Sequence, residues 1–279
     1  MGKLDGKVAF ISGAARGQGR SHAIKLAEEG ANIIAFDICE DVESIAVLYP
    51  LATPADLEET VRLVEEAGGK ILARKADVRN YAQVKAVLDE GVEMFGHVDI
   101  VLANAGVVSL NKAWEYTEQT WNDVVDINLT GVWNTVRAAI PLMIERGQGG
   151  SIIITSSTAG IKGYGHTAPY SAAKHGVVGL MQSLANELGE FKIRVNTIHP
   201  TNADTPMLQN EGTYRLFMPD RENPGRDDLG KMFEEMGAPI PIPWVDAKDI
   251  SAAVLFLVSD EARYVTGVQL PVDGGAVIK

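Results

Sequence analysis

The sequence predicts one α/β domain in which a seven-stranded, doubly wound parallel sheet carries helices on both faces. Three observations predict it: seven short apolar runs alternate with helical patterns, no Ser/Gly-rich linker divides the 279 residues, and nothing repeats internally. Repeated strand and helix units pair in parallel through right-handed crossovers, and strands buried on both faces are apolar throughout. The expected strands are 8–11, 32–36, 71–75, 98–103, 151–155, 193–198 and 268–272.

Several of the intervening helices are marked at their ends. Gly30, Gly68 and Gly96 follow helical patterns and fit C-terminal caps, since glycine adopts the left-handed conformation there at little cost. Thr53-Pro54 fits a helix start, with Thr as the N-cap and Pro at the first helical position.

The first apolar run leads into a glycine-rich turn, Gly13-Ala14-Ala15-Arg16-Gly17-Gln18-Gly19, and then into a helical pattern. Glycines let a pyrophosphate approach the backbone, and free N–H groups at a helix start attract anions. Asp37 closes the second run about 20 residues later, where a carboxylate can accept hydrogen bonds from an adenosine ribose. These features predict a Rossmann-like dinucleotide site at the carboxyl ends of the strands.

Tyr170 and Lys174 lie four residues apart, thirteen residues after Ser157 at the end of the fifth run. Residues four apart share a helix face, and a neighbouring ammonium lowers the pKa of a phenol that otherwise titrates near ~10. The pattern predicts that Tyr170 is an acid/base, that Lys174 tunes it, and that Ser157 is a second hydroxyl on the substrate oxygen. A second Tyr-x-x-x-Lys, Tyr81 and Lys85, follows no strand-like run, so we interpret it as a helix-surface pair.

Taken in order, these motifs resemble those of the short-chain dehydrogenase/reductase family, and the resemblance extends over essentially the whole chain. The matching pieces are Gly13/Gly17/Gly19, Asp77-Val78, Asn104-Ala105-Gly106, Asn128, Ser157, Tyr170 and Lys174. The resemblance implies reversible hydride transfer between an alcohol and a nicotinamide, with Lys174 also holding the nicotinamide ribose. It further implies that the Asp-Val pair brackets the adenine, that the Asn-Ala-Gly turn supports the central strand, and that Asn128 holds a water in the proton relay.

The segment after the sixth run both follows and departs from the family pattern. Thr205 matches a threonine that bonds the nicotinamide carboxamide, whereas Pro200-Thr201 stands where most members have Pro-Gly. The expected catalytic residues are Asn128, Ser157, Tyr170 and Lys174. The expected cofactor-binding residues are Gly13, Arg16, Gly17, Gln18, Gly19, Asp37, Asp77, Val78, Asn104, Ala105, Gly106, Tyr170, Lys174, Pro200, Asn202 and Thr205. No metal site is expected, because the five histidines show no ligand spacing.

Two connections at the carboxyl ends of the strands exceed the ~2–6 residues usual for such loops. Residues 38–52 are rich in apolar side chains and resemble the actinobacterial carveol dehydrogenase-like branch of the family, which is associated with the redox cofactor mycofactocin. This insertion is expected to cover the cofactor; the alternative is that it covers the sheet edge or packs on a neighbouring subunit. Residues 199–246 carry methionines and aromatics, which suit a lid over an apolar substrate or packing within the protein or its oligomer.

Three rival functions share parts of this pattern. An NADPH-dependent reductase of thioester-linked ketones would use Arg16 for the 2′-phosphate, but Asp37 would repel that phosphate, so we predict NAD. A catalytically silent dinucleotide-binding protein would not need the complete catalytic set. A sugar-nucleotide epimerase would carry a sizeable extra C-terminal domain, which this chain lacks.

Composition narrows the class of protein further. The net charge of −12 argues against a nucleic-acid or anionic-membrane surface. Cys39 is the one cysteine, which excludes an intrachain disulfide and fits a reducing cytosol; it is either an inert small hydrophobe or a reactive thiol. The N-terminus lacks a signal-peptide core, and no apolar run approaches the ~20 residues that span a bilayer. We expect a cytoplasmic homotetramer that acts on a small apolar alcohol or ketone and passes electrons to an external acceptor of the mycofactocin type.

Overall fold

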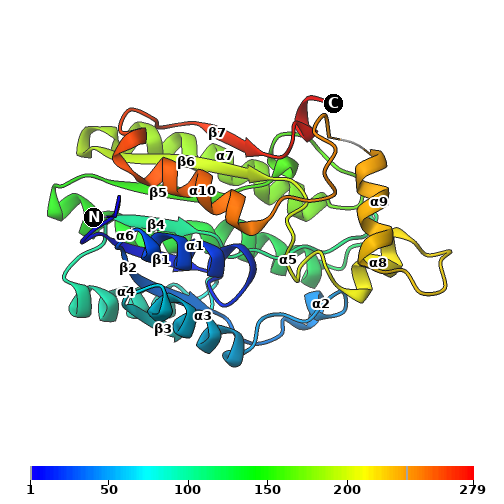
Figure 1. Cartoon of the computed structure of the whole chain (residues 1–279), viewed down its shortest axis with the longest axis horizontal. Helices are drawn as coiled ribbons and strands as arrows, with labels where there is room; N and C mark the ends of the chain where they lie inside the picture. Colours follow the sequence, from blue (N-terminus) through cyan, green and yellow to red (C-terminus); the bar gives the residue numbers. More distant parts are fainter. Residues whose placement is uncertain (1, 237) are drawn as a thin grey trace.

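The computed structural model describes residues 2–236 and 238–279 and contains the predicted parallel sheet, with strand order β3-β2-β1-β4-β5-β6-β7 (Figure 1). The strands are β1 (Val8–Ser12), β2 (Asn32–Asp37), β3 (Ile71–Lys75), β4 (Ile100–Ala103), β5 (Gly150–Thr155), β6 (Ile193–Pro200) and β7 (Gln269–Val272). All six neighbouring pairs are parallel. Each predicted strand is found; the fourth begins two residues later than expected and the sixth ends two residues later.

The order of the strands reverses between β1 and β4. From β1 the chain moves outward to β3, returns beside β1 as β4, and then moves outward in the other direction to β7. In an open sheet of this kind, ligands bind in the crevice at the carboxyl ends beside that switch point. The predicted glycine turn follows β1, and the Asn-Ala-Gly turn follows β4, so both lie at the switch point.

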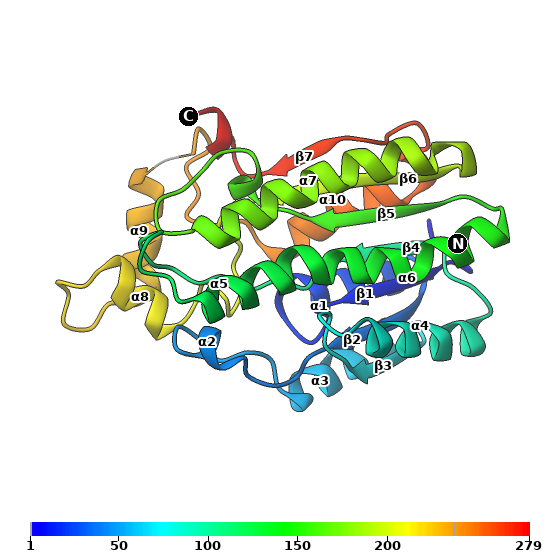
Figure 2. The same ribbon diagram turned by 180° about the vertical axis from the view of Figure 1, so that it is seen from behind.

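Helices cover both faces of the sheet. The helices are α1 (Gly17–Glu28), α2 (Glu43–Ala46), α3 (Pro54–Glu66), α4 (Tyr81–Phe95), α5 (Glu118–Val125), α6 (Gly131–Arg146), α7 (Ala168–Leu188), α8 (Glu211–Phe217), α9 (Arg226–Met236) and α10 (Ala247–Val258). A π-helical turn, η1 (Asp126–Thr130), joins α5 to α6, and 3₁₀ turns are η2 (Thr158–Gly160), η3 (Gly189–Phe191), η4 (Asp260–Ala262) and η5 (Ala276–Ile278). Figure 1 shows α1, α3 and α10 on one face, and Figure 2 shows α4, α5, α6 and α7 on the other.

The alternation of side chains along the strands divides the core into two parts. On β1, Phe10 belongs to the cluster under α4, α6 and α7, whereas Ala9 and Ile11 belong to the cluster under α1 and α10. Phe10 stacks on Phe36 of β2 with ring centroids 5.1 Å apart. Burial on both faces explains why these strands are apolar throughout.

The predicted helix ends are confirmed. Gly96 is the C-cap of α4 with φ 88°, and Gly30 and Gly68 follow the last residues of α1 and α3 with φ 93° and 87°. Thr53 caps α3 through a reciprocal pair of bonds, since its hydroxyl accepts the Asp56 N–H and its own N–H donates to the Asp56 carboxylate. The described helices include none with the length and apolar content needed to cross a membrane.

The two long connections are folded segments at the carboxyl ends of the strands. The insertion at 38–52 contains α2, and the segment 199–246 contains α8 and α9. Figure 1 places α2, α8, α9 and the η5 region at the same end of the molecule. Functional side chains are therefore expected between these segments and the sheet.

Candidate active site

A cavity of about 780 Å³ lies at the carboxyl ends of the strands. Every predicted site residue except Gly19 lines it. The volume falls within the ~300–1,000 Å³ range of small-molecule and cofactor sites. The structure thus gathers residues from across the sequence into one space.

Gly19 lies beneath the cavity instead of lining it. A Cβ at Gly19 would lie 2.0 Å from the Gly13 carbonyl oxygen and 2.8 Å from Nδ2 of Asn104. The absence of a side chain therefore lets α1 pack directly against the turn. Its place in the structure supports the other glycines, and its part in cofactor binding stays a prediction.

The glycine turn leaves its backbone open to the cavity. Gly13 and Gly17 have φ 66° and 58°, and a Cβ at Gly13 would lie 2.7 Å from Cα of Ala105. Arg16 is the N-cap of α1 but makes no side-chain hydrogen bond to the first turn. Free N–H groups at the start of a helix form an anion site, so this turn can hold a pyrophosphate.

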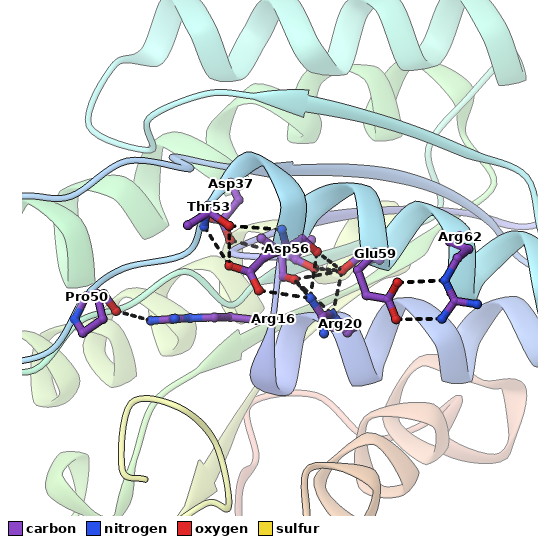
Figure 3. Close-up of polar contacts among 11 residues, drawn as sticks. Arg16, Arg20, Asp37, Pro50, Thr53, Asp56, Glu59 and Arg62 are labelled. Atoms are coloured by element: carbon purple, nitrogen blue, oxygen red, sulfur yellow. Dashed lines mark hydrogen bonds and ion pairs between the residues drawn. The ribbon is translucent and has the colours of Figure 1, made fainter. Parts of the chain in front are cut away.

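Asp37 and Arg16 have different surroundings at the end of β2 (Figure 3). One oxygen of Asp37 accepts the Ala15 N–H at 3.0 Å, and both carboxylate oxygens retain capacity to accept further bonds. Burial raises the pKa of Asp37, opposed by backbone N–H groups including those of Ala15 and Cys39. The Arg16 guanidinium donates to the Pro50 carbonyl of the insertion at 2.6 Å. Arg16 is thus engaged by the insertion, while Asp37 faces the cavity.

Asp77 is held in place by a chain of charged groups. Arg79 donates its N–H and Nε–H to the two Asp77 oxygens, each at 2.8 Å, and its Nη1 donates to Asp123 of α5 at 2.8 Å. Asn134 of α6 donates to the Val78 carbonyl at 2.8 Å. These bonds fix the Asp77-Val78 pair at the cavity wall.

Asn104 ties together the ends of three central strands. Its Nδ2 donates to the carbonyls of Ser12 and Gly13, both at 3.2 Å, and its Oδ1 accepts the Thr155 hydroxyl at 3.2 Å. This network matches the supporting role that the resemblance implies for the Asn-Ala-Gly turn.

Ser157 and Tyr170 approach each other across the cavity. Ser157 ends the extended segment after β5, and its Oγ accepts the Ala159 N–H at 3.1 Å. Tyr170 lies in the first turn of α7 and lines the same cavity as Ser157. Burial raises the pKa of Tyr170, and the hydrogen bond with the Ser157 side chain opposes that rise.

Lys174 lies one turn along α7 from Tyr170, as the spacing predicts. Its Nζ is 5.5 Å from the Tyr170 ring centroid and donates to the Thr155 carbonyl at 2.8 Å. Burial lowers the pKa of Lys174 from 10.5 to about 7. The expected lowering of the Tyr170 pKa by Lys174 is not found, because burial raises that pKa and the hydrogen bond that opposes the rise comes from Ser157.

Asn128 is buried in the π-helical turn η1. Its Nδ2 donates to the carbonyls of Val107 and Val124 at 2.8 Å, and its Oδ1 accepts the Val107 N–H at 3.3 Å. A Cβ at Gly106 would lie 2.8 Å from this Oδ1 and 3.4 Å from Nζ of Lys174. Gly106 therefore keeps open the space between Asn128 and Lys174.

His199 does not line the cavity but supports a residue that does. It is fully buried behind Ser157, and its Nδ1 donates to the Ser157 carbonyl at 2.8 Å while Nε2 meets the Thr197 hydroxyl at 2.8 Å. Only the position of His199 at the end of a strand could have suggested such a role.

The insertion forms one wall of the cavity. Its cavity-lining residues are Ile38, Val42, Tyr49, Leu51 and Ala52. Ser44 donates to Asp123 of α5 at 2.7 Å, and the buried Tyr49 hydroxyl accepts the Val108 N–H at 3.2 Å. Cys39 is buried there with its pKa raised to about 12, chiefly by desolvation, so its thiol stays protonated.

The segment 199–246 forms the opposite wall. Its cavity-lining side chains include Met207, Leu208, Phe217, Phe233 and Met236. Asp204 pairs with Arg226 through two bonds of 2.6 and 2.7 Å, which fixes the start of α9. A Cβ at Gly212 of α8 would lie 2.0 Å from the Leu48 carbonyl oxygen, so this segment and the insertion touch.

The second Tyr-x-x-x-Lys pair lies outside the cavity, as predicted. The Tyr81 ring stacks on the Arg137 guanidinium, whose Cζ is 3.8 Å from the ring centroid, and Lys85 pairs with Asp89 on the surface of α4. Within the described ranges, no group of three or more His, Cys, Asp or Glu side chains is arranged to hold a metal ion.

Comparisons with known proteins show which family this chain resembles. Residues 7–215 match the family model described as short chain dehydrogenase. The chain is 52% identical to (-)-trans-carveol dehydrogenase of Rhodococcus erythropolis, over 100% of both chains. It is 36% identical to trans-4-hydroxycyclohexanecarboxylate dehydrogenase of Sinomonas cyclohexanicum, over 96% of this chain and 92% of that one.

A solved structure agrees over the whole chain. Carveol dehydrogenase from Mycobacterium avium in complex with NAD superposes with a TM-score of 0.97 and 54% identity, covering 100% of both chains. The predicted fold and family are confirmed, and the predictions of NAD and of alcohol–ketone chemistry agree with what these relatives are named for. The chain belongs to the short-chain dehydrogenase family.

Proposed function

We propose that the protein is an NAD-dependent dehydrogenase that interconverts an apolar secondary alcohol and its ketone. The observation that carries this proposal is that Ser157, Tyr170 and Lys174 line the same cavity as Asp37 and the glycine turn. The cavity fits a dinucleotide, because it combines an open helix start for the pyrophosphate with a buried carboxylate for a ribose diol. The relatives named for carveol and for NAD support both parts of the proposal.

The residues divide the chemistry between them. NAD, when bound, would accept the hydride from the carbinol carbon. Ser157 and Tyr170 hydrogen-bond the alcohol oxygen, and the Tyr170 oxygen takes the hydroxyl proton. Lys174 would hold the nicotinamide ribose beside the phenol, and Asn128, across the space left by Gly106, would carry the proton onward through a water. Preorganised donors around the developing alkoxide contribute much of the barrier lowering.

The cavity walls support an apolar substrate. Met207, Phe217 and Phe233 line the side of the cavity formed by 199–246, which we propose is the substrate lid. Flexible thioethers and aromatic rings suit an alicyclic, terpenoid-like alcohol. The alternative, an NADPH-dependent 3-ketoacyl-thioester reductase, is disfavoured because Asp37 would repel a 2′-phosphate and the Arg16 guanidinium already binds Pro50.

We further propose that the insertion at 38–52 covers the bound cofactor and slows its release. Its residues line the cavity next to Asp37, and its contact at Gly212 closes the gap to the lid. Turnover would then require an external acceptor of the mycofactocin type to re-oxidise the bound cofactor.

A cytoplasmic homotetramer is also proposed, and the exposed rings of Trp121 and Trp133 on α5 and α6 offer apolar surface for subunit contact.

Replacing Tyr170 by Phe tests the proposed function. The variant keeps the ring but loses the exchangeable proton, so turnover of carveol should fall by at least ~10²-fold, the lower range for general acid/base catalysis. Binding of NAD, followed by fluorescence titration, should change little. Tyr81→Phe is the matched control on α4 and should retain activity; comparable losses in both variants would refute the assignment.

A further inference from the structure

The turn that follows β7 forms part of the wall of the active-site cavity. Asp273 and Ala276 line the same cavity as Ser157 and Tyr170. Figure 1 shows this turn beside α9, at the carboxyl end of the sheet. The residues concerned are 273–278, here named the 273–278 turn.

The 273–278 turn is internally fixed. The Asp273 carboxylate accepts the N–H groups of Gly275 and Val277, both at 2.9 Å, and the Asp273 carbonyl accepts the Ala276 N–H at 3.1 Å. Gly274 and Gly275 have φ 61° and 88°, a conformation that side chains rarely adopt. The segment therefore has a defined shape that can act as a wall.

This turn is also docked on the substrate lid. The Ile240 N–H donates to the Gly274 carbonyl at 3.0 Å, and a Cβ at Gly275 would lie 2.9 Å from Cγ of Pro239. Ala238 and Ile242, on either side of this contact, line the cavity. The lid and the 273–278 turn consequently form one continuous surface.

Lys162 joins that surface to the catalytic side of the cavity. It follows η2, the turn that begins directly after Ser157, and its Nζ donates to the Ala276 carbonyl at 2.9 Å. Its Nζ also lies 5.5 Å from the ring centroid of Tyr164, another cavity residue. The Lys162 Nζ also donates to the main-chain oxygen of Lys279 at 3.4 Å, so both acceptors that orient this cation belong to the C-terminal segment.

We propose that Lys162 is a latch that holds the 273–278 turn closed across the substrate end of the cavity and thereby limits the size of the alcohol accepted. The inference rests on the proposed function, since it assigns that end of the cavity to substrate. Lys162 acts through the turn and is a specificity-determining residue with no part in the chemical step. The favoured substrates are compact monocyclic alcohols, and fused bicyclic alcohols are disfavoured.

Lys162→Met and Lys162→Arg test the latch. Methionine keeps an apolar chain of similar length but cannot donate, whereas arginine can still reach a carbonyl. Loss of a charge-assisted bond should raise hydrogen exchange of the backbone amides at 274–278 about tenfold or more in Lys162→Met. Lys162→Arg should exchange as the unmodified protein does. Equal exchange in all three proteins would overturn the latch.

Substrate discrimination provides the second measurement. In Lys162→Met the ratio of kcat/KM for 2-decalol to that for cyclohexanol should rise about tenfold, with the KM for cyclohexanol raised and kcat little changed. An unchanged ratio would overturn the inference. So would a selective loss of kcat/KM on trans-4-hydroxycyclohexanecarboxylate, because Lys162 would then be binding a substrate carboxylate directly. Hydrogen exchange needs no turnover, so it decides the latch even if the protein oxidises none of these alcohols and the proposed function fails.

Discussion

At the scale of single residues, Asp37 and Arg16 favour different cofactors: the Asp37 carboxylate favours NAD, and the Arg16 guanidinium would favour NADP. Both line the cavity. The Arg16 guanidinium donates to the Pro50 carbonyl, whereas the Asp37 carboxylate accepts hydrogen bonds from backbone N–H groups alone among the described residues. A buried carboxylate needs hydrogen-bond donors, and a ribose diol supplies two of them. A 2′-phosphate in the same place would bring a second negative charge.

Asp37→Ala should therefore weaken NAD binding and narrow the preference for NAD over NADP by about ten- to a hundredfold, the worth of one or two charge-assisted hydrogen bonds. Equilibrium titration with each cofactor provides the measurement. Glu59→Ala removes the same charge from α3, where Glu59 pairs with exposed Arg62, and should leave both affinities unchanged (Figure 3). Tighter binding of NADP than NAD by the unmodified protein would contradict this prediction and show that Arg16 determines the cofactor preference.

Residue spacing revealed some of these roles and not others. Tyr170 and Lys174 could be predicted because both lie on one helix, where four residues make about one turn. Lys162 and Ala276 are 114 positions apart, and the bond between them exists only in the folded chain. The pKa shifts of Tyr170 and Lys174 could not be predicted from the sequence either, because desolvation depends on all the groups that pack around these side chains.

At the scale of elements, the insertion is held to the body of the protein at separate points. Ser44 of α2 donates to Asp123 of α5, the Pro50 carbonyl accepts from Arg16, and the Tyr49 hydroxyl accepts the Val108 N–H at 3.2 Å. The helix α2 has only four residues, too few for a periodic pattern. The sequence therefore predicted an apolar connection but not the helix within it. Its position is set by Asp123, which is 79 residues away.

Ser44→Ala should loosen the insertion and speed cofactor exchange about tenfold, because a hydrogen bond to a buried carboxylate is lost. The measurement is incorporation of isotopically labelled NAD into the purified protein, with and without alcohol. Ser183→Ala on the exposed side of α7 removes a comparable hydroxyl far from the cavity and serves as the control. Rapid mixing of label in the unmodified protein, with full turnover on free NAD, would show that the insertion has another purpose.

At the scale of the whole molecule, central strands such as β1 and β5 were predictable because they are buried on both faces and are therefore rich in apolar residues, whereas the edge strands β3 and β7 are partly exposed. The order of the strands was not predicted, because the right-handedness of the crossovers does not say in which direction each one moves along the sheet. The pairing of helices across the outer faces was not predictable, since it depends on matching surfaces far apart in sequence. The contact of α1 with α10 is such a case, and it buries a histidine.

His22 of α1 is enclosed against α10, where its Nδ1 meets the Ser251 hydroxyl at 2.7 Å and its Nε2 has no partner among the described residues. Burial lowers the pKa of His22 to about 3, against ~6.5 in an unfolded chain. Between these values the unfolded chain binds the extra proton, so the free energy of unfolding should fall as the pH falls. The loss approaches about 1.4 kcal/mol per pH unit, or roughly 2–3 kcal/mol between pH 6.5 and 4.5.

Urea unfolding at pH 7, 5.5 and 4.5 should show this slope, and His22→Gln should lack that part of it. His175→Gln, an exposed change on α7, should retain the slope of the unmodified protein. If His22→Gln were to retain it as well, the buried ring would not be the group that couples folding to acid.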